Sequence, residues 1–154
     1  MIRPTNFGTN EETFEDNKFM NKVNESPQAK SLLEFNNYVE KLNTNGIETI
    51  IYDQPHVDAV DAIFPNNWFS THTGENFPTD GLLVLYPMKS KLRRLERSET
   101  IIADLQKQYK NTLDLRYLEE NNHILESTGS LIFDDENRLI FCGLYIYIYY
   151  FIKS

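Results

Sequence analysis

Two neighbouring side-chain amides, Asn66 and Asn67, interrupt an apolar stretch and are the residues best placed to do chemistry. They lie in the sequence Asp-Ala-Ile-Phe-Pro-Asn-Asn-Trp-Phe-Ser-Thr-His, residues 61–72. Amide groups are costly to bury unless a protein group or a polar ligand meets their hydrogen bonds. The pair therefore indicates either a site for a polar ligand or an Asx turn after Pro65.

Two further segments carry candidate ligand groups. Residues 93–97 read Arg-Arg-Leu-Glu-Arg, and residues 125–130 read Leu-Glu-Ser-Thr-Gly-Ser. A guanidinium group can hold a carboxylate through two parallel hydrogen bonds. On a helix, Arg93 and Arg97 share a face while Arg94 projects about 100° away, so the three cannot all bind one ligand. The alternative interpretation is a solvated charged face for the arginines and a solvated strand end for Glu126.

Composition and charge narrow the classes of partner. The 154 residues are 40% hydrophobic and 13% aromatic, enough for one domain with a sizeable core. The formal net charge of −8 argues against a nucleic acid or an anionic membrane as partner, because like charges repel. The lone Cys142 cannot form an internal disulfide, and the N-terminal residues lack the pattern of a secretion signal. A small-molecule ligand and a cytoplasmic location are expected.

Alternating helices and strands are expected to position these groups. Ser26 and Pro27 predict the start of a helix over residues 27–44, which Gly46 ends. Apolar spacing predicts a second helix over residues 91–109.

The strands are expected where β-branched and apolar residues cluster. The runs that predict strands are residues 47–52, 82–86, 131–133 and 139–141. The last two flank a polar turn and predict a hairpin. The order of the elements indicates an α/β fold, although periodicity alone equally allows a three-layer α/β or an α+β domain.

Taken in order, the three polar segments resemble the N-terminal half of the amidinotransferase and arginine deiminase superfamily, the guanidino-modifying enzymes of the pentein fold. The closest likeness is to the branch of citrulline-utilisation hydrolases, whose pattern runs close to D-x-(V/I)-F-P-N-N-W, R-R-x-E-R and L-E-G-T-G-S. The opening residues 2–7, Ile-Arg-Pro-Thr-Asn-Phe, are similar to that branch's first strand. The resemblance covers residues 1–142 and implies a partial pentein, about half of an α/β propeller of ββαβ-type repeats.

This resemblance implies roles for Asn67 in the amide segment and for Glu126 in the segment over residues 125–130. Asn67 aligns with the acidic residue that grips the guanidinium in arginine deiminases. An amide there suits a neutral ureido group, as in citrulline, because it donates and accepts hydrogen bonds without charge. Glu126 matches the acidic residue that orients the catalytic histidine. Ser127 replaces the usual glycine and would strain the turn if that position needed a positive φ.

The resemblance also implies which residues bind the α-carboxylate and the α-amino group of a guanidino or ureido amino acid. One of Arg93, Arg94 and Arg97 is similar to the arginines that receive the α-carboxylate of the substrate. Asp61 is expected to help hold the α-amino group. Which arginine serves is left open.

The family's catalytic histidine and cysteine lie downstream of the region that this chain resembles. The resemblance therefore implies a chain that is inactive alone, although the full-length family hydrolyses a C–N bond through a covalent cysteine adduct. Cys142 ends a predicted strand and is expected to be a small core residue. His56, His72 and His123 lack metal-ligand spacing and are expected in loops or at the surface, so neither metal nor cofactor is expected.

The last residues form a second unusual feature. Residues 144–152 are all apolar or aromatic, but a membrane span needs about 20 such residues. The run has instead the signature of an aggregation-prone strand. The resemblance stops near Cys142, which predicts a domain over 1–142 and a non-family tail over 143–154, as in a truncated or frameshifted product. Two function classes stay open: an enzyme fragment, and a non-enzymatic α/β protein that self-associates through this tail.

Overall fold

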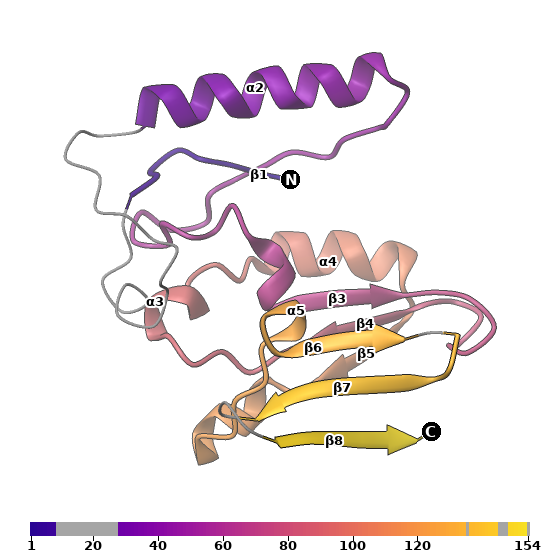
Figure 1. Ribbon diagram of the computed structural model, residues 1–154. Coiled ribbons are helices and arrows are strands. Elements are labelled where there is room, and N and C mark those ends of the chain that lie inside the picture. The colour runs from indigo at the N-terminus through magenta and orange to yellow at the C-terminus, as the bar shows by residue number, and fades with distance from the viewer. Residues whose placement is uncertain (9–27, 135, 145–147, 154) are drawn as a thin grey trace. The chain divides into compact units, whose positions relative to one another are not determined.

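The computed structural model describes residues 1–8, 28–134, 136–144 and 148–153 (Figure 1). The chain divides into two compact units. One unit comprises residues 1–65 and 90–98, and the other comprises residues 66–89 and 99–154. Both contain small sheets and helices, as the expected α/β class requires.

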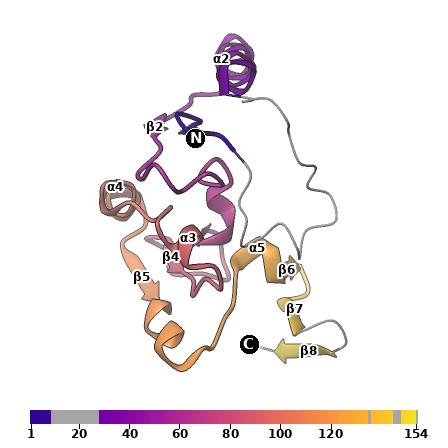
Figure 2. The same ribbon diagram turned by 90° about the vertical axis from the view of Figure 1, so that its left-hand side faces the viewer.

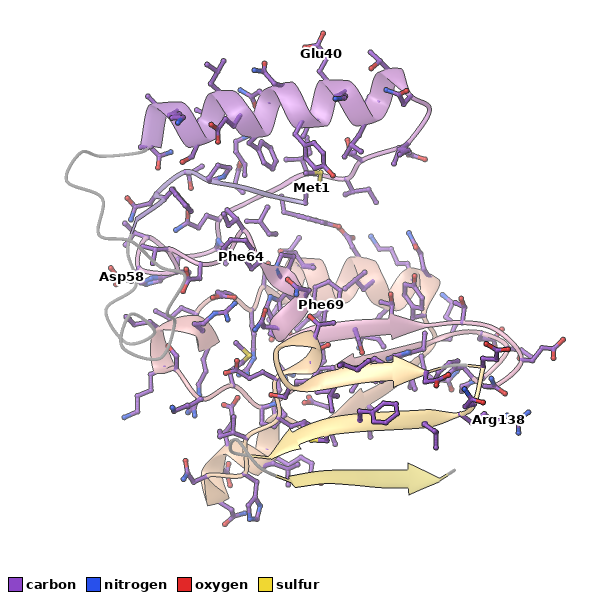
Figure 3. The ribbon with its side chains drawn as sticks, viewed as in Figure 1. Met1, Glu40, Asp58, Phe64, Phe69 and Arg138 are labelled. Carbon is purple, nitrogen blue, oxygen red and sulfur yellow. The ribbon has the colours of Figure 1, made fainter. Side chains whose placement is uncertain are left out.

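The first unit is built on a short parallel pair of strands. β1 (Ile2–Arg3) pairs with β2 (Tyr52–Asp53), and the helix α2 (Gln28–Thr44) lies between them in sequence. Figure 3 shows Met1 on the side of α2 that faces β1, whereas Glu40 projects from the opposite side. Apolar side chains of α2 and the β1 segment line a hollow of about 470 Å³.

The predicted helix over 27–44 is confirmed from Gln28 onward, and Gly46 follows it with a φ of +79°. The proposed start at Ser26 and Pro27 lies outside the described residues. The predicted strand over 47–52 is wrong apart from its last residue, because only Tyr52–Asp53 pairs. Ile47 and Ile50 are each 53% exposed. Without neighbouring strands to pack on, β-branched residues do not form a ladder.

The single helix predicted over 91–109 is also wrong. Two helices form, α3 (Lys91–Arg94) and α4 (Glu99–Gln108). Between them, the backbone N–H groups of residues 95–97 donate to carbonyl groups three residues earlier, which tightens the turn. Arg97 therefore lies beyond α3, and the expectation that it shares a helix face with Arg93 is not met.

The second unit contains two three-stranded sheets. In the first, β3 (Phe69–His72) runs antiparallel to β4 (Leu82–Leu85), and β4 runs parallel to β5 (Asn111–Asp114). The parallel pair needs a crossover connection, which α4 provides. Figure 2 shows α4 and the second sheet on opposite sides of this one.

The second sheet confirms the predicted hairpin. β6 (Leu131–Asp134) pairs with β7 (Leu139–Leu144), and β8 (Ile148–Lys153) pairs with the other side of β7, all antiparallel. The aromatic tail thus includes a paired strand, although its residues 145–147 lie outside the described residues. In the described part of the chain, no helix is long and apolar enough to cross a membrane.

The core of the second unit lies between its sheets. Val84, Tyr86 and Leu131 form its buried cluster. Partly buried side chains pack against this cluster, namely those of Leu82, Leu115, Leu125, Phe133, Ile140 and Cys142. Tyr86 brings a hydroxyl into this apolar layer, and such a group needs a hydrogen-bond partner there.

Candidate functional site

The amide segment is joined to the Leu-Glu-Ser-Thr-Gly-Ser segment by side-chain hydrogen bonds. Asn66 lies in η1, a 3-10 turn over Pro65–Asn67. Its Nδ2 donates to Thr128 Oγ1 at 2.6 Å, and Thr128 Oγ1 donates to the Asn66 carbonyl oxygen at 3.2 Å. The side chain of Asn66 therefore bonds to a residue far along the chain, and the simple Asx turn is not what forms.

Asn67 lies against the glycine of the same segment. A Cβ atom added to Gly129 would stand 2.7 Å from Asn67 Nδ2 and 3.6 Å from Glu126 Oε2. A glycine is therefore needed at residue 129 for the amide to keep this position. The structure thus brings together two of the predicted site residues, Asn67 and Glu126, both half-buried.

The Glu126 carboxylate is fixed at one oxygen. Its Oε1 accepts a hydrogen bond from the Lys89 backbone N–H at 2.9 Å. Glu126 precedes the short helix α5 (Ser127–Ser130), and its carbonyl oxygen accepts from the Ser130 N–H at 2.7 Å. Glu126 is therefore an anchored group rather than the solvated strand end of the alternative interpretation.

The strain considered for Ser127 does not occur. The described non-glycine residues with positive φ are Asn122 and Arg138, so Ser127 has an ordinary backbone. Its side chain is fully buried. Ser127 therefore fits this turn without backbone strain, and its hydroxyl is buried.

The groups that hold this turn in place carry no signal in the sequence. Glu119 Oε1 accepts from the Met88 N–H at 2.7 Å, and the Leu125 N–H donates to the Pro87 carbonyl oxygen at 3.1 Å. These bonds attach the turn to the segment that follows β4. Glu119 lies in η2, a 3-10 stretch over Arg116–Asn121, and no local pattern in the sequence marks it.

His72 was expected in a loop or at the surface, but it lies on β3 in a chain of hydrogen bonds. Its Nε2 is 2.7 Å from Ser70 Oγ, which is 2.8 Å from the Tyr86 hydroxyl oxygen. The His72 ring contacts the rings of Phe77 and Phe133 at centroid distances of 4.8 and 4.9 Å. Burial raises the pKa of Tyr86, and the hydroxyls of Ser70 and Ser127 oppose this rise. The spacing of Ser70 and His72, two residues apart on a strand, was the available signal.

The first unit holds the other predicted site residues. Arg93 Nε donates to Glu96 Oε1 at 2.7 Å, and its second nitrogen donates to Glu96 Oε2 at 3.2 Å, which makes a bidentate pair. Asp61 Oδ2 lies 4.0 Å from Arg93 Nε, and the Phe64 carbonyl accepts from Arg93 at 3.3 Å. Asp61, Arg93 and Glu96 are all buried.

A comparison with models of known protein families shows to which family the chain belongs. The family model of N,N dimethylarginine dimethylhydrolase, eukaryotic, matches residues 3–145. The chain belongs to this family. The expected superfamily of guanidino-modifying pentein enzymes is thereby confirmed. No curated protein and no solved structure matches the chain.

The match to the dimethylarginine dimethylhydrolase family spans every predicted site residue. Asp61 and Arg93 belong to one compact unit, whereas Asn67 and Glu126 belong to the other. Arg94 and Arg97 are half-buried.

Cys142 packs as sequence analysis predicted. It lies on β7, half-buried against the cluster of Val84, Tyr86 and Leu131. Burial raises the pKa of its thiol. The thiolate is the nucleophilic form, so this cysteine lacks the setting that activates a nucleophile. Among the described residues, no three His, Cys, Asp or Glu side chains come together as metal ligands.

Proposed function

We propose that the amides of residues 66–67 and the turn over residues 126–129 recognise the planar group of a guanidino or ureido amino acid. In this proposal the chain supplies the recognition part of a hydrolase of the dimethylarginine dimethylhydrolase family. The observation that carries the proposal is the position of Asn67 Nδ2 over Gly129, beside the Glu126 carboxylate.

The chemistry of the amide favours a neutral planar group. An amide donates through its nitrogen and accepts through its oxygen, so it can match the oxygen and the nitrogens of a ureido group. A cationic guanidinium would gain more from a carboxylate, because hydrogen bonds between charged partners are stronger. We therefore propose citrulline, or a similar ureido amino acid, as the preferred ligand.

For the other end of the ligand we propose the groups that the family resemblance implies. Asp61 is proposed to bind the α-amino group, and an arginine of residues 93–97 to bind the α-carboxylate. Arg93 is already paired with Glu96 through two hydrogen bonds and lies close to Asp61. We therefore propose that Arg93 holds Asp61 and the turn after α3 in place. Arg94 and Arg97 are then the candidates for direct contact with the carboxylate.

We propose that this chain binds such a ligand but does not hydrolyse it. Hydrolysis through a covalent adduct needs an activated nucleophile. Cys142 is the single cysteine of the chain, and burial raises the pKa of its thiol.

A titration followed by NMR tests the proposed recognition. Addition of citrulline should shift the side-chain amide resonances of Asn67 and the backbone amide of Gly129. Asn67→Ala should weaken binding about tenfold, the loss expected when the ligand loses the hydrogen bonds of this half-buried amide. Asn37→Ala on the exposed side of α2 is the matched control and should leave binding unchanged. No shift at Asn67 or Gly129, or equal binding by Asn67→Ala, would contradict the proposal.

A second role, self-association, is favoured by β8. This strand lies at one of the two edges of its sheet, and the sequence from Leu144 to Ile152 carries no charge. An apolar edge strand can pair with a second chain. Light scattering over a range of concentrations tests this role, and a monomer at every concentration would reject it.

A further inference from the structure

Ser70 and His72 on β3 form a hydrogen-bonded pair that the proposed recognition does not use. Ser70 Oγ lies 2.7 Å from His72 Nε2. The two side chains lie on the same face of the strand, because they are two residues apart. A base can activate a serine hydroxyl when an imidazole nitrogen lies within about 2.6–3.2 Å of the hydroxyl oxygen. The distance in this pair meets that requirement.

The Tyr86 hydroxyl fixes the direction in which Ser70 gives its proton. Its oxygen lies 2.8 Å from Ser70 Oγ, and the residue is 3% exposed. Burial raises the pKa of Tyr86, so the hydroxyl keeps its proton and can donate a hydrogen bond. When Tyr86 donates to Ser70 Oγ, the single proton of Ser70 is left for His72 Nε2. The three groups thus form a chain in which each hydroxyl donates toward the imidazole.

The imidazole ring of His72 is held by two aromatic side chains. Its centroid lies 4.8 Å from that of Phe77, with the two rings stacked, and 4.9 Å from that of Phe133. A base that is oriented by further groups keeps its nitrogen directed at the nucleophile. Ser70 and His72 are half-buried, so part of the pair is open to solvent.

We propose that Ser70 is a nucleophile, with His72 as its base, and that it accepts the acyl group of an activated ester. Ser70 Oγ bonds to the carbonyl carbon of the ester, and the bond from that carbon to the alcohol oxygen breaks. The proton of Ser70 passes to His72 Nε2 and then to the departing oxygen, so the products are an acyl-serine and an alcohol. This reaction is compatible with the proposed lack of citrulline hydrolysis, because a ureido carbon is much less electrophilic than the carbonyl carbon of an activated ester.

The small activated ester p-nitrophenyl acetate tests the proposal. Peptide mapping by mass spectrometry should find the acetyl group on Ser70 of the folded chain. Ser130 is the matched control within the same chain, because it is half-buried in the same unit and its hydroxyl accepts from the Glu126 backbone N–H at 3.4 Å. Ser70 should be acetylated about a hundredfold faster than Ser130, the effect of a positioned base. In urea, where the fold no longer holds the pair together, the two serines should react at similar rates.

His72→Phe separates the role of the base from the packing of its ring. This variant keeps a ring for the aromatic contacts but removes the nitrogen that accepts the proton. Acetylation of Ser70 should slow about a hundredfold, whereas His123→Phe, at an exposed histidine of the same unit, should leave the rate unchanged. Equal acetylation of Ser70 and Ser130 in the folded chain would overturn the proposal, and so would an unchanged rate in a folded His72→Phe. If His72→Phe does not fold, the comparison of Ser70 with Ser130 decides alone.

Discussion

Asn66 and Thr128, 62 residues apart in the chain, are joined by two hydrogen bonds that both use the hydroxyl group of Thr128. One bond uses the side chain of Asn66 and the other uses its backbone carbonyl. This double contact fixes the 3-10 turn at Pro65–Asn67 against the helix α5. It links two polar segments that are distant in the sequence.

Thr128→Val should separate these two segments. Valine keeps the shape of threonine but can neither donate nor accept, so both hydrogen bonds are lost. Because the two side chains are exposed, the loss of unfolding free energy should be small, about 0.5–1 kcal/mol. Urea denaturation measures it, with Thr5→Val at an exposed threonine as control. A loss no larger than that of Thr5→Val would show that the contact is not formed in solution.

Gly129→Ala should displace the Asn67 amide without unfolding the chain. The added Cβ would stand 2.7 Å from Asn67 Nδ2, the far end of a side chain that can rotate away. Citrulline affinity should fall about tenfold, whereas the melting temperature should change by only a few degrees. Gly143→Ala is the matched control, since its Cβ would have 3.7 Å to its nearest neighbour. Equal affinities of the two variants would refute the close fit of Asn67 over Gly129.

The buried pair in the first unit should matter for stability. Glu96→Gln removes the charge that Arg93 holds through two hydrogen bonds, and it should cost about 3 kcal/mol of unfolding free energy. Glu99→Gln is the matched control, because the Glu99 side chain is 82% exposed in its pair with Arg116. That change should cost less than about 1 kcal/mol. Chemical denaturation measures the free energy of unfolding of both variants. Equal losses in the two variants would show that the Arg93–Glu96 pair is not buried in solution.

Cys142 should behave as a protected thiol. Because burial raises its pKa in the folded chain, alkylation by iodoacetamide should be slower than in urea and should accelerate only at higher pH. The stabilising contribution of the neutral thiol is complete below the pKa of the unfolded chain. It is lost as pH rises through the folded pKa. Mass spectrometry gives the rates.

The same thiol should support no turnover. Ammonia release from citrulline or arginine should stay at background in the unaltered chain and in Cys142→Ser. Release that Cys142→Ser abolishes would show that Cys142 is a nucleophile after all.

The hairpin and the helix after residue 27 could be predicted because their signals are local. Apolar residues on both sides of a polar turn predicted β6 and β7, and helical spacing predicted α2. The helix break at residues 95–98 was not predicted, and it lies beside the buried pair of Arg93 and Glu96. Sequence spacing alone places both residues on an exposed helix face.

The residues of the candidate site could be predicted from the sequence, but the hydrogen bonds that hold them together could not. The order of the segments pointed to Asn67 and Glu126, and the structure brings them together over Gly129. The contacts that hold them involve Thr128 and a backbone N–H of Lys89, which carry no signal in the sequence. Long-range contacts of this kind follow from the packing of the sheets, and local propensity does not contain that information.

The preference of Asn67 for a neutral group is the central claim, and one comparison tests it most directly. Citrulline and arginine are titrated into the unaltered chain and into Asn67→Asp, and the four dissociation constants are measured by NMR or calorimetry. The unaltered chain should bind citrulline more tightly than arginine, and Asn67→Asp should reverse this order, because a carboxylate matches the cationic guanidinium. An unchanged citrulline-to-arginine preference in a folded Asn67→Asp would contradict the account, since residue 67 would then not contact the planar group.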